Sequence, residues 1–324
     1  MANSAATLAP CLRAVLAALP PGAEVIVVDD GSTDGSYEIA RGFPVRRVRL
    51  AETRGAAHAR NVGIAYARAP LCFFLDSDIV VRPDTLALAL RIMTEDPGLA
   101  GLFGSYGPET PHLNIFSQYK NLIHHYTHQT SSDYPGTFCS GFGAIRKNVF
   151  RQLGGFDGYR RRLEDIELGY RLYLAGYRVR LVKEMQVTHL KRYTLLSLVK
   201  SDLLGRAVPW TELMLRYKIF RFDLNLKPHN ALSAIVALGL LFALPAAFLV
   251  EACCLALPLL LICFFWLNRK FFDFVLETGG LSLMLSVIAL SWLTYLLSVL
   301  GAAIGAFQWA RKAAIVGWAS ARAE

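Results

Sequence analysis

Long runs without charged residues fill the C-terminal part of the chain and constrain its fold more than any other feature. Residues 231–250, 252–267 and 281–306 contain no Asp, Glu, Lys or Arg. A helix needs about 20 consecutive apolar residues to cross a bilayer. The sequence therefore predicts an α-helical transmembrane region of about three spans over 230–310, followed by a basic tail over 311–324.

These runs allow two membrane topologies. If three spans start in the cytoplasm, Arg311 and Lys312 lie outside the cell, against the tendency of basic residues to stay on the cytoplasmic side. The second run is short, and a re-entrant hairpin over 231–267 returns the tail to the cytoplasm. With a hairpin, spanning or re-entrant, the turn at 268–270 lies on the same side as the N-terminal domain. Both topologies remain open at this point.

The residues before the apolar runs divide into two regions. Residues 1–192 have the charged content of a soluble domain, whereas residues 193–229 mix apolar residues with lysines and arginines. Basic amphipathic segments beside a membrane span usually lie in the headgroup plane. We therefore expect interfacial helices over 193–229, and the alternative is a surface helix packed on the domain.

The net charge of +9 is compatible with nucleic acid, anionic lipid or phosphate-bearing ligands as partners. A nucleic-acid surface requires clustered basic residues with interleaved aromatic residues. The sequence has no such cluster, so nucleic acid is not expected as a partner. Beside long apolar runs, membrane lipids are the favoured partner. The six cysteines form no CxxC pair, which is typical of free thiols in a reducing compartment.

Short β-branched or aromatic runs alternate with helical segments through the N-terminal domain. Buried strands are predicted at 24–28, 45–50 and 71–75, with a helix at 55–68 between the last two. This alternation predicts an α/β fold with a Rossmann-like, mainly parallel sheet and helices on both faces. Further helices are predicted at 5–19, 83–93, 114–128 and 163–175, and further strands at 138–145 and 177–182.

Paired carboxylates follow two of the predicted strands, at the sheet edge where α/β proteins bind ligands. Asp29 and Asp30 can accept hydrogen bonds from a base N–H or from ribose hydroxyls, and the alternative is a helix N-cap. Asp76 and Asp78 are one residue apart and can share a hard cation such as Mg²⁺ or Mn²⁺. The alternative for them is a solvated loop, and we favour the cation.

Other candidate residues lie at the ends of predicted helices and strands. Arg54 and Asn61 are candidate substrate-binding residues beside and within the helix at 55–68. Arg54 can meet a diphosphate at the start of this helix, unless it is an ordinary surface arginine. Glu164 and Asp165 open a helix and offer a general base, unless they only complement the helix dipole. His189 can complete a metal shell, although a lone histidine is more often structural.

His124 and His128 are four residues apart, as zinc ligands on a helix are. A glutamate after His124 and a third ligand are both missing from the pattern. We interpret both histidines as polar residues near an acceptor cleft, with zinc binding as the minor alternative.

Five motifs occur in order and together carry a family resemblance. They are VVDDGSTD at 27–34, RGxxxARN at 54–61, DSD at 76–78, GGFD at 154–157 and EDxELGxRL at 164–172. The chain resembles family 2 glycosyltransferases, which have the nucleotide-sugar transferase fold called GT-A. The resemblance covers about residues 3–192, and it implies a UDP- or GDP-sugar as the donor substrate.

The resemblance also implies roles for the donor-binding residues. Asp29 and Asp30 match contacts to the nucleoside, and Arg54 matches a contact to the base or the diphosphate. Asp76 and Asp78 match the DxD motif, which implies a divalent metal, Mg²⁺ or Mn²⁺, with Asp78 as its ligand.

For the transfer step, the resemblance implies an inverting reaction. Asp165 matches the catalytic base, with Glu164 beside it, and His189 lies where some relatives have a further metal ligand. If the acceptor is already a phosphate, a base is hardly needed and Asp165 positions it.

The sequence departs from the family pattern in two places. Relatives begin with an apolar strand that is missing before Asn3, so we expect such a strand to be encoded upstream of Met1. Processive synthases carry a QxxRW motif that residues 203–210 do not match. We therefore expect transfer of a single sugar to a lipid or polyprenyl-phosphate-linked acceptor, at the inner membrane with the catalytic domain in the cytoplasm. The alternatives are a processive polysaccharide synthase and a non-catalytic nucleotide-sugar-binding membrane protein.

Overall fold

The computed structural model of the protein describes residues 1–221, 224–247 and 251–320, which form two compact units. Unit 1 comprises Met1–His112 and His124–Arg192. Unit 2 comprises Leu113–Ile123 and the described residues from Tyr193 onward. Residues 222–223, 248–250 and 321–324, within the predicted interfacial, spanning and tail regions, lie outside the described residues.

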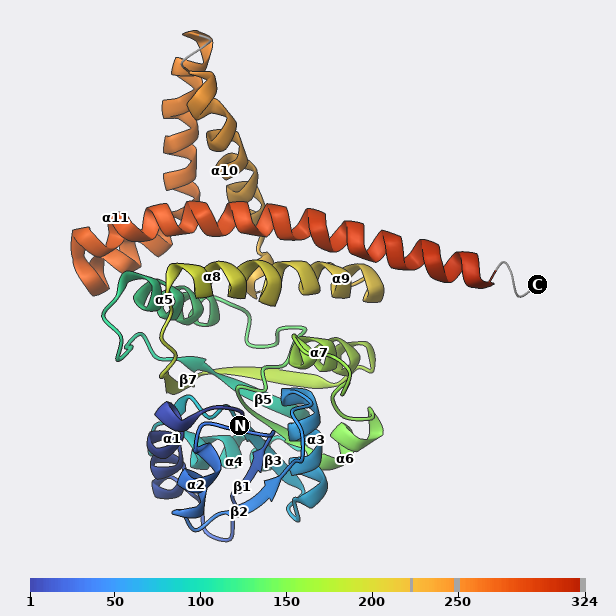
Figure 1. Cartoon of the computed structure of the whole chain (residues 1–324). Coiled ribbons are helices and arrows are strands. Elements are labelled where there is room, and N and C mark those ends of the chain that lie inside the picture. Colours follow the sequence, from blue (N-terminus) through green and yellow to red (C-terminus); the bar gives the residue numbers. More distant parts are fainter. Residues whose placement is uncertain (222–223, 248–250, 321–324) are drawn as a thin grey trace. The chain divides into compact units, whose positions relative to one another are not determined.

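Unit 1 is an α/β domain in which seven strands are described, and the α/β fold class is confirmed (Figure 1). Its strands are β1 (Ile26–Asp29), β2 (Arg46–Arg49), β3 (Leu71–Leu75), β4 (Ile79–Val81), β5 (Leu99–Tyr106), β6 (Phe142–Arg146) and β7 (Arg178–His189). Its helices are α1 (Ala5–Ala17), α2 (Ser36–Arg41), α3 (Ala56–Tyr66), α4 (Thr85–Glu95), α6 (Lys147–Gln152) and α7 (Glu164–Leu174), and α5 (Ile115–Gln129) is shared with unit 2.

The strands form two sheets whose pairing is mixed, which corrects the expectation of a mainly parallel sheet. β1 and β2 are a parallel pair on their own, and the larger sheet has the order β3-β6-β5-β7-β4. In the larger sheet only β5 and β7 run parallel, and the other three pairs are antiparallel. The turn after β3 sends the chain into β4, which pairs antiparallel with the far end of β7. Hydrophobic runs identify buried strands but do not encode their direction.

Strand β5 was missed by the sequence analysis because it contains two glycines, which are unfavourable in strands. The close approach of neighbouring backbones explains both of them. A Cβ on Gly104 would lie 2.1 Å from the carbonyl oxygen of Met185, and one on Gly101 would lie 2.7 Å from that of Ala144. β5 therefore sits between β6 and β7 only because these positions carry no side chain.

Helix α1 links the two sheets through two of its faces. Leu8 and Leu12 pack with Val27 of the small sheet, whereas Cys11 and Val15 pack with the large sheet. Beside β1, the backbone of Met1 hydrogen-bonds to Val28 and Asp30. The strand expected upstream of Met1 stays a prediction.

Unit 2 is helical throughout its described secondary structure. Besides the first part of α5 it contains α8 (Leu195–Asp202), the π-helical turn η1 (Leu203–Ala207), α9 (Val208–Tyr217), the short turn η2 (Leu224–Leu226), α10 (Pro228–Ala246) and α11 (Glu251–Ser320). Among the described residues, two helices are long and apolar enough to cross a membrane, at Pro228–Ala246 and Ala256–Ile315. These two long apolar helices are consistent with membrane association.

The predicted second and third spans both lie in α11, which consists of two helical segments that meet at a kink at Gly280. Gly280 has a φ of 75°, a conformation that residues with a Cβ rarely adopt. Before the bend α11 packs beside α10, and after the bend it extends along α9 (Figure 1). The number of transmembrane spans therefore depends on whether the segment after Gly280 crosses the bilayer.

A buried ion pair connects α5 to α8 inside unit 2. Lys120 Nζ lies 2.5 Å from Asp202 Oδ1, and the two side chains are 2% and 6% exposed. Removing one partner of such a pair leaves an uncompensated buried charge.

The Lys120→Met variant is expected to lower the free energy of unfolding of unit 2 by about 3–5 kcal/mol. Denaturant unfolding in nonionic micelles, followed by tryptophan fluorescence, measures this loss. In the double variant Lys120→Met/Asp202→Leu no charge is left behind, so most of the loss should be recovered. Equal losses in the single and double variants would contradict this explanation.

Candidate active site

The first candidate carboxylates follow β1 and are both buried. Asp30 accepts hydrogen bonds from the backbone N–H groups of Arg54 and Gly55, at 2.9 and 2.8 Å. Asp29 accepts from Ser32 N–H at 3.1 Å, and its Oδ2 lies 3.3 Å from Arg49 Nε without a hydrogen bond among the described residues. Both carboxylates thus organise the loops at this edge. The nucleoside contact stays a prediction for both residues. Asp29 Oδ2, which accepts no hydrogen bond among the described residues, can accept one from a ligand.

Arg54, just before α3, and Asn61, in the middle of α3, have different surroundings. The Arg54 guanidinium is exposed and pairs with Glu52 at 2.8 Å. Asn61 donates to the carbonyl of Phe156 at 2.8 Å and accepts from its N–H at 3.0 Å. Asn61 therefore ties α3 to the GGFD loop. Arg54 donates to Glu52 through Nε and Nη2, so binding a phosphate with these atoms requires that pair to break.

Arg60 connects two of the predicted carboxylates that are far apart in sequence. Its Nη2 lies 2.6 Å from Asp76 Oδ1 and its Nη1 lies 2.5 Å from Glu164 Oε1, and its side chain is only 15% exposed. The guanidinium also lies over the Phe156 ring, 5.8 Å from the centroid. The sequence analysis did not assign Arg60 a role. Arg60 lies six residues after Arg54 in the same RGxxxARN motif, and this was the sequence signal that could have identified it.

Glu164 and Asp165 begin α7 after a strained residue. Leu163 has a φ of 55°, which is uncommon for a residue with a Cβ and occurs often at functional sites. Asp165 accepts from the N–H groups of Ile166 and Ser140 at 2.9 and 3.3 Å. Burial and the neighbouring Glu164 charge raise the pKa of Asp165 to about 6, while the Arg60 charge acts in the opposite direction. A carboxylate with this pKa suits a general base near neutral pH.

Asp78 and His189 form the second group, with β4 and β7 bringing them together. His189 Nε2 lies 3.3 Å from Asp78 Oδ2. Burial opposes ionisation of Asp78, but the hydrogen bond and charge of His189 outweigh it and lower the pKa of Asp78. The His189 ring stacks on Tyr106 with centroids 5.0 Å apart.

His124 and His128 also stack on Tyr106, at 5.5 and 5.8 Å between centroids. Their rings therefore contribute to an aromatic cluster beside His189. Their place near an acceptor cleft stays a prediction.

The fit of a divalent cation to these residues is partial. Among the described residues, no group of three or more His, Cys, Asp and Glu side chains is arranged to hold a metal ion. Asp78 and His189 are adjacent, whereas Asp76 is turned toward Arg60. One carboxylate and one imidazole fit a cation that takes its remaining ligands from phosphate and water, as Mg²⁺-like ions do. A site for Asp76, Asp78 and His189 together requires Asp76 to leave Arg60.

Two of the carboxylates predicted from distant segments, Asp76 and Glu164, thus meet at Arg60. Asp165, whose pKa is raised, lies in the same cluster as Asp76 at the end of β3. Such an arrangement can bind a cationic or hydroxyl-bearing ligand and remove a proton from it.

Comparison with known proteins shows what the N-terminal part of the chain is similar to. Residues 1–154 match the model of "Glycosyl transferase family 2". The succinoglycan biosynthesis protein ExoU of Rhizobium meliloti is 42% identical over 93 residues, which cover 27% of this chain and 27% of that protein. The poly-beta-1,6-N-acetyl-D-glucosamine synthase of Staphylococcus aureus is 28% identical over 192 residues, which cover 55% of this chain and 45% of the synthase. The matches thus span less than half the length of these relatives.

Solved structures agree on the fold. The mannosyltransferase PcManGT from Pyrobaculum calidifontis, in complex with GDP-Man and Mn²⁺, superposes with a TM-score of 0.59 at 18% identity, over 95% of this chain and 84% of that one. Residues 1–349 of S. aureus TarS, in complex with UDP-GlcNAc, give a TM-score of 0.50 at 16% identity, over 67% of this chain and 69% of that one. The expected GT-A fold is confirmed.

Proposed function

Because residues 1–154 belong to glycosyl transferase family 2, we propose that the chain moves a single sugar from a nucleotide-diphosphate sugar to a lipid-linked acceptor at the membrane, with inversion. The observation that carries this proposal is the Arg60-centred cluster, in which Glu164 and Asp76 are held beside a base-like Asp165. The long apolar helices of unit 2 support an acceptor that resides in the bilayer.

In the proposed reaction Asp165 acts on the acceptor. Its carboxylate takes the proton of an acceptor hydroxyl, and that oxygen attacks the anomeric carbon from the face opposite the diphosphate. The N–H groups of Ser140 and Ile166 hold the carboxylate in place. If the acceptor is a phosphate, its oxygen is already ionised and no proton has to be removed. Asp165 then only positions the acceptor.

For the donor, the proposed ligands are a UDP- or GDP-sugar and a divalent cation, as in the solved relatives with GDP-Man and Mn²⁺ or with UDP-GlcNAc. Asp78 and His189 would hold the cation, and Asp76 would join them after exchanging its Arg60 contact. When bound, the cation neutralises the charge that develops on the leaving diphosphate. Asp29 and Asp30 are proposed to contact the nucleoside and Arg54 the diphosphate.

We place the enzyme in the plasma (inner) membrane with its catalytic domain in the cytoplasm. Lys227, Arg269 and Lys270 flank the apolar parts of α10 and α11, and basic flanks favour the cytoplasmic side.

The test is a transfer assay with the full chain in lipid nanodiscs. Labelled UDP- and GDP-sugars are offered singly with a polyprenyl-phosphate acceptor, with Mn²⁺ or with a chelator, and the lipids are extracted. The expected result is one lipid carrying one sugar, formed only with metal. Absence of metal-dependent sugar release from every donor would overturn the proposal.

A processive synthase is the second candidate, because the poly-beta-1,6-N-acetyl-D-glucosamine synthase matches 55% of this chain. The same assay separates the two functions by product size. A ladder of long products on a gel would favour the synthase and contradict single-sugar transfer.

Arg60 provides a prediction about pH. Its positive charge lowers the pKa of Asp165, so the Arg60→Met variant should raise that pKa further. The pH of half-maximal transfer is expected to move upward by about one unit or more, with a smaller shift in Arg60→Lys. The pH–rate profile measures it, and Arg41→Met, which breaks an exposed pair with Glu38, is the control. An unshifted profile in Arg60→Met would show that Arg60 does not act on Asp165.

A further inference from the structure

The hairpin of α10 and the first part of α11 presents large apolar side chains to its surroundings. Ile235, Phe242, Leu259, Ile262 and Trp266 are each 64–67% exposed. Between residues 231 and 267 the sequence contains one charged residue, Glu251. Exposed apolar surface on this scale marks an interaction site.

The open end of the hairpin is polar and tightly bonded. Asn268 is buried and donates to Ser233 Oγ at 3.0 Å, which joins the two legs. The Tyr295 hydroxyl, from the segment after Gly280, lies 2.7 Å from Asn268 Oδ1 and 3.1 Å from Asn230 Oδ1. The polar network therefore fixes the base of the hairpin to the later part of α11.

Beyond this network the later part of α11 leaves the hairpin and follows α9. A Cβ on Gly301 would lie 2.3 Å from Ala207 Cβ, and one on Gly305 would lie 2.5 Å from the carbonyl oxygen of Val208. Lys312 pairs with Glu212 of α9 at 3.0 Å. The segment thus lies across the base of the hairpin rather than along it (Figure 1).

One face of this segment is exposed and apolar. Leu285, Leu300 and Phe307 are 58%, 49% and 70% exposed. At 3.6 residues per turn they lie within about 60° of one another around the helix axis. Gly301 and Gly305, which face α9, lie on the other side of the helix. The apolar face therefore points away from α9.

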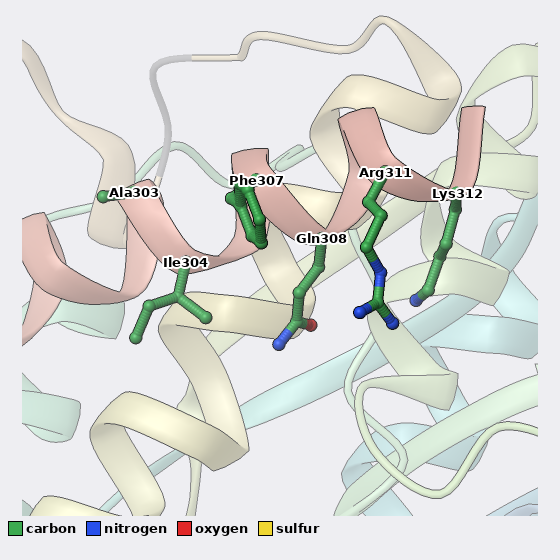
Figure 2. Close-up of a pocket in the computed structure, with 6 residues that line it drawn as sticks. All are labelled: Ala303, Ile304, Phe307, Gln308, Arg311 and Lys312. Carbon is green, nitrogen blue, oxygen red and sulfur yellow. The ribbon is translucent and has the colours of Figure 1, made fainter. Parts of the chain in front are cut away.

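The exposed end of the same segment is basic. A hollow of about 630 Å³ along α11 is lined by apolar Ala303, Ile304 and Phe307 and then by Gln308, Arg311 and Lys312. Figure 2 shows the side chains of Gln308, Arg311 and Lys312 pointing to the same side of the helix. Lys312 is paired with Glu212, so Arg311 is the basic group considered for the headgroup. An apolar surface that ends in a basic group matches an anionic lipid, whose chains are apolar and whose headgroup is negative.

We propose that unit 2 is a one-sided membrane anchor for an anionic lipid bilayer: the hairpin enters the bilayer and returns, and the segment after Gly280 lies in the headgroup plane. A helix that ends in the headgroup plane keeps its apolar face in lipid and its basic groups at the surface. The third apolar run is then an interfacial helix, and Arg311 lies on the same side of the membrane as the catalytic domain. The proposal is independent of which sugar is transferred.

Depth measurements distinguish this anchor from three spans. Single cysteines at Leu285, Leu300 and Phe307, in a chain whose six native cysteines are replaced by serine, are labelled with bimane and reconstituted in vesicles with anionic lipid. Lipids that carry a quencher near the headgroup or deep in the chain report depth. An in-plane segment gives the same shallow-to-deep quenching ratio at all three sites, within about twofold. A spanning segment, rising about 1.5 Å per residue, gives ratios that differ severalfold.

Sidedness provides the second readout. An impermeant maleimide added outside sealed vesicles should label Arg41→Cys and Ala313→Cys in the same vesicle population and to the same extent. Labelling of the two sites from opposite sides would overturn the proposal. Absence of lipid quenching at all three depth sites, with a dimer on cross-linking, would assign the apolar face to a second copy and also overturn it. Transfer activity and monodispersity of each variant verify folding.

Discussion

Replacing Asp165 by asparagine is expected to lower the rate of sugar transfer by about 100-fold or more, the usual loss when a general base is removed. Asparagine keeps the shape of the side chain, and its single oxygen can still accept from Ile166 N–H, whereas the longer bond from Ser140 N–H to the second oxygen is lost. Affinity for the nucleotide sugar should therefore stay within about twofold. Initial rates and donor titration by calorimetry give the two quantities.

Wild-type transfer should also depend on pH in a defined direction. The pKa of Asp165 is raised to about 6, so the carboxylate is available above that pH and the rate should rise as pH increases through about 6. The folded state binds this proton more tightly than the unfolded state does. Its contribution to stability is complete below the ordinary aspartate pKa of about 4 and is lost as pH rises through about 6.

Asparagine has no charge to bury, so Asp165→Asn should be more stable than wild type above pH 6 although it is less active. Thermal unfolding at pH 5 and pH 8 tests this, with Asp133→Asn as the control because Asp133 belongs to an exposed pair with Lys183. Parallel losses of donor binding and transfer in Asp165→Asn would indicate a structural role instead.

The Asp78→Asn variant is expected to lose the metal activation of transfer. Asp78 is the carboxylate that His189 contacts, and its lowered pKa keeps it ionised at neutral pH. Without this charge the rate at 1 mM Mn²⁺ should fall by about 100-fold, comparable to the loss of a group that stabilises transition-state charge. The measurement is a titration of the transfer rate with Mn²⁺.

Raising the Mn²⁺ concentration should recover part of the rate if Asp78 binds the metal. The matched variant Asp76→Asn separates the two carboxylates, because Asp76 is paired with Arg60 rather than with His189. Circular dichroism confirms that the variants are folded. Full turnover in Asp78→Asn, with metal still required, would remove Asp78 from the metal site.

The sequence alone determined the features that depend on local pattern. Apolar runs without charge predicted the helices at the C-terminal end, and strand β3 was predicted with its observed ends, Leu71–Leu75. Asp29, Asp30, Asp76 and Asp78 were located because they lie at the ends of buried strands, and ordered motifs carried the family resemblance. Each of these patterns lies within a few neighbouring residues, so it can be recognised without knowledge of the fold.

Contacts between distant residues were decided only by the tertiary structure. Arg60 and Glu164 are 104 residues apart, and nothing local indicates that their side chains meet. Both polar atoms of the Asn61 side chain hydrogen-bond to Phe156, a contact that the sequence did not indicate, and its role in substrate binding stays a prediction. The partner of a polar side chain depends on which loops the fold brings together, and a single sequence does not record that.

The same reason explains the strand directions and the third apolar run. Hydrophobicity reports that a segment is buried, but it does not report the neighbour that covers it. Gly101 and Gly104 allow β6 and β7 to approach β5 closely. Residues 281–306 extend along α9 because the chain changes direction at Gly280 and because Gly301 and Gly305 allow close packing. Amino-acid composition determined which segments are shielded from water, and tertiary packing determined the position of each segment in the fold.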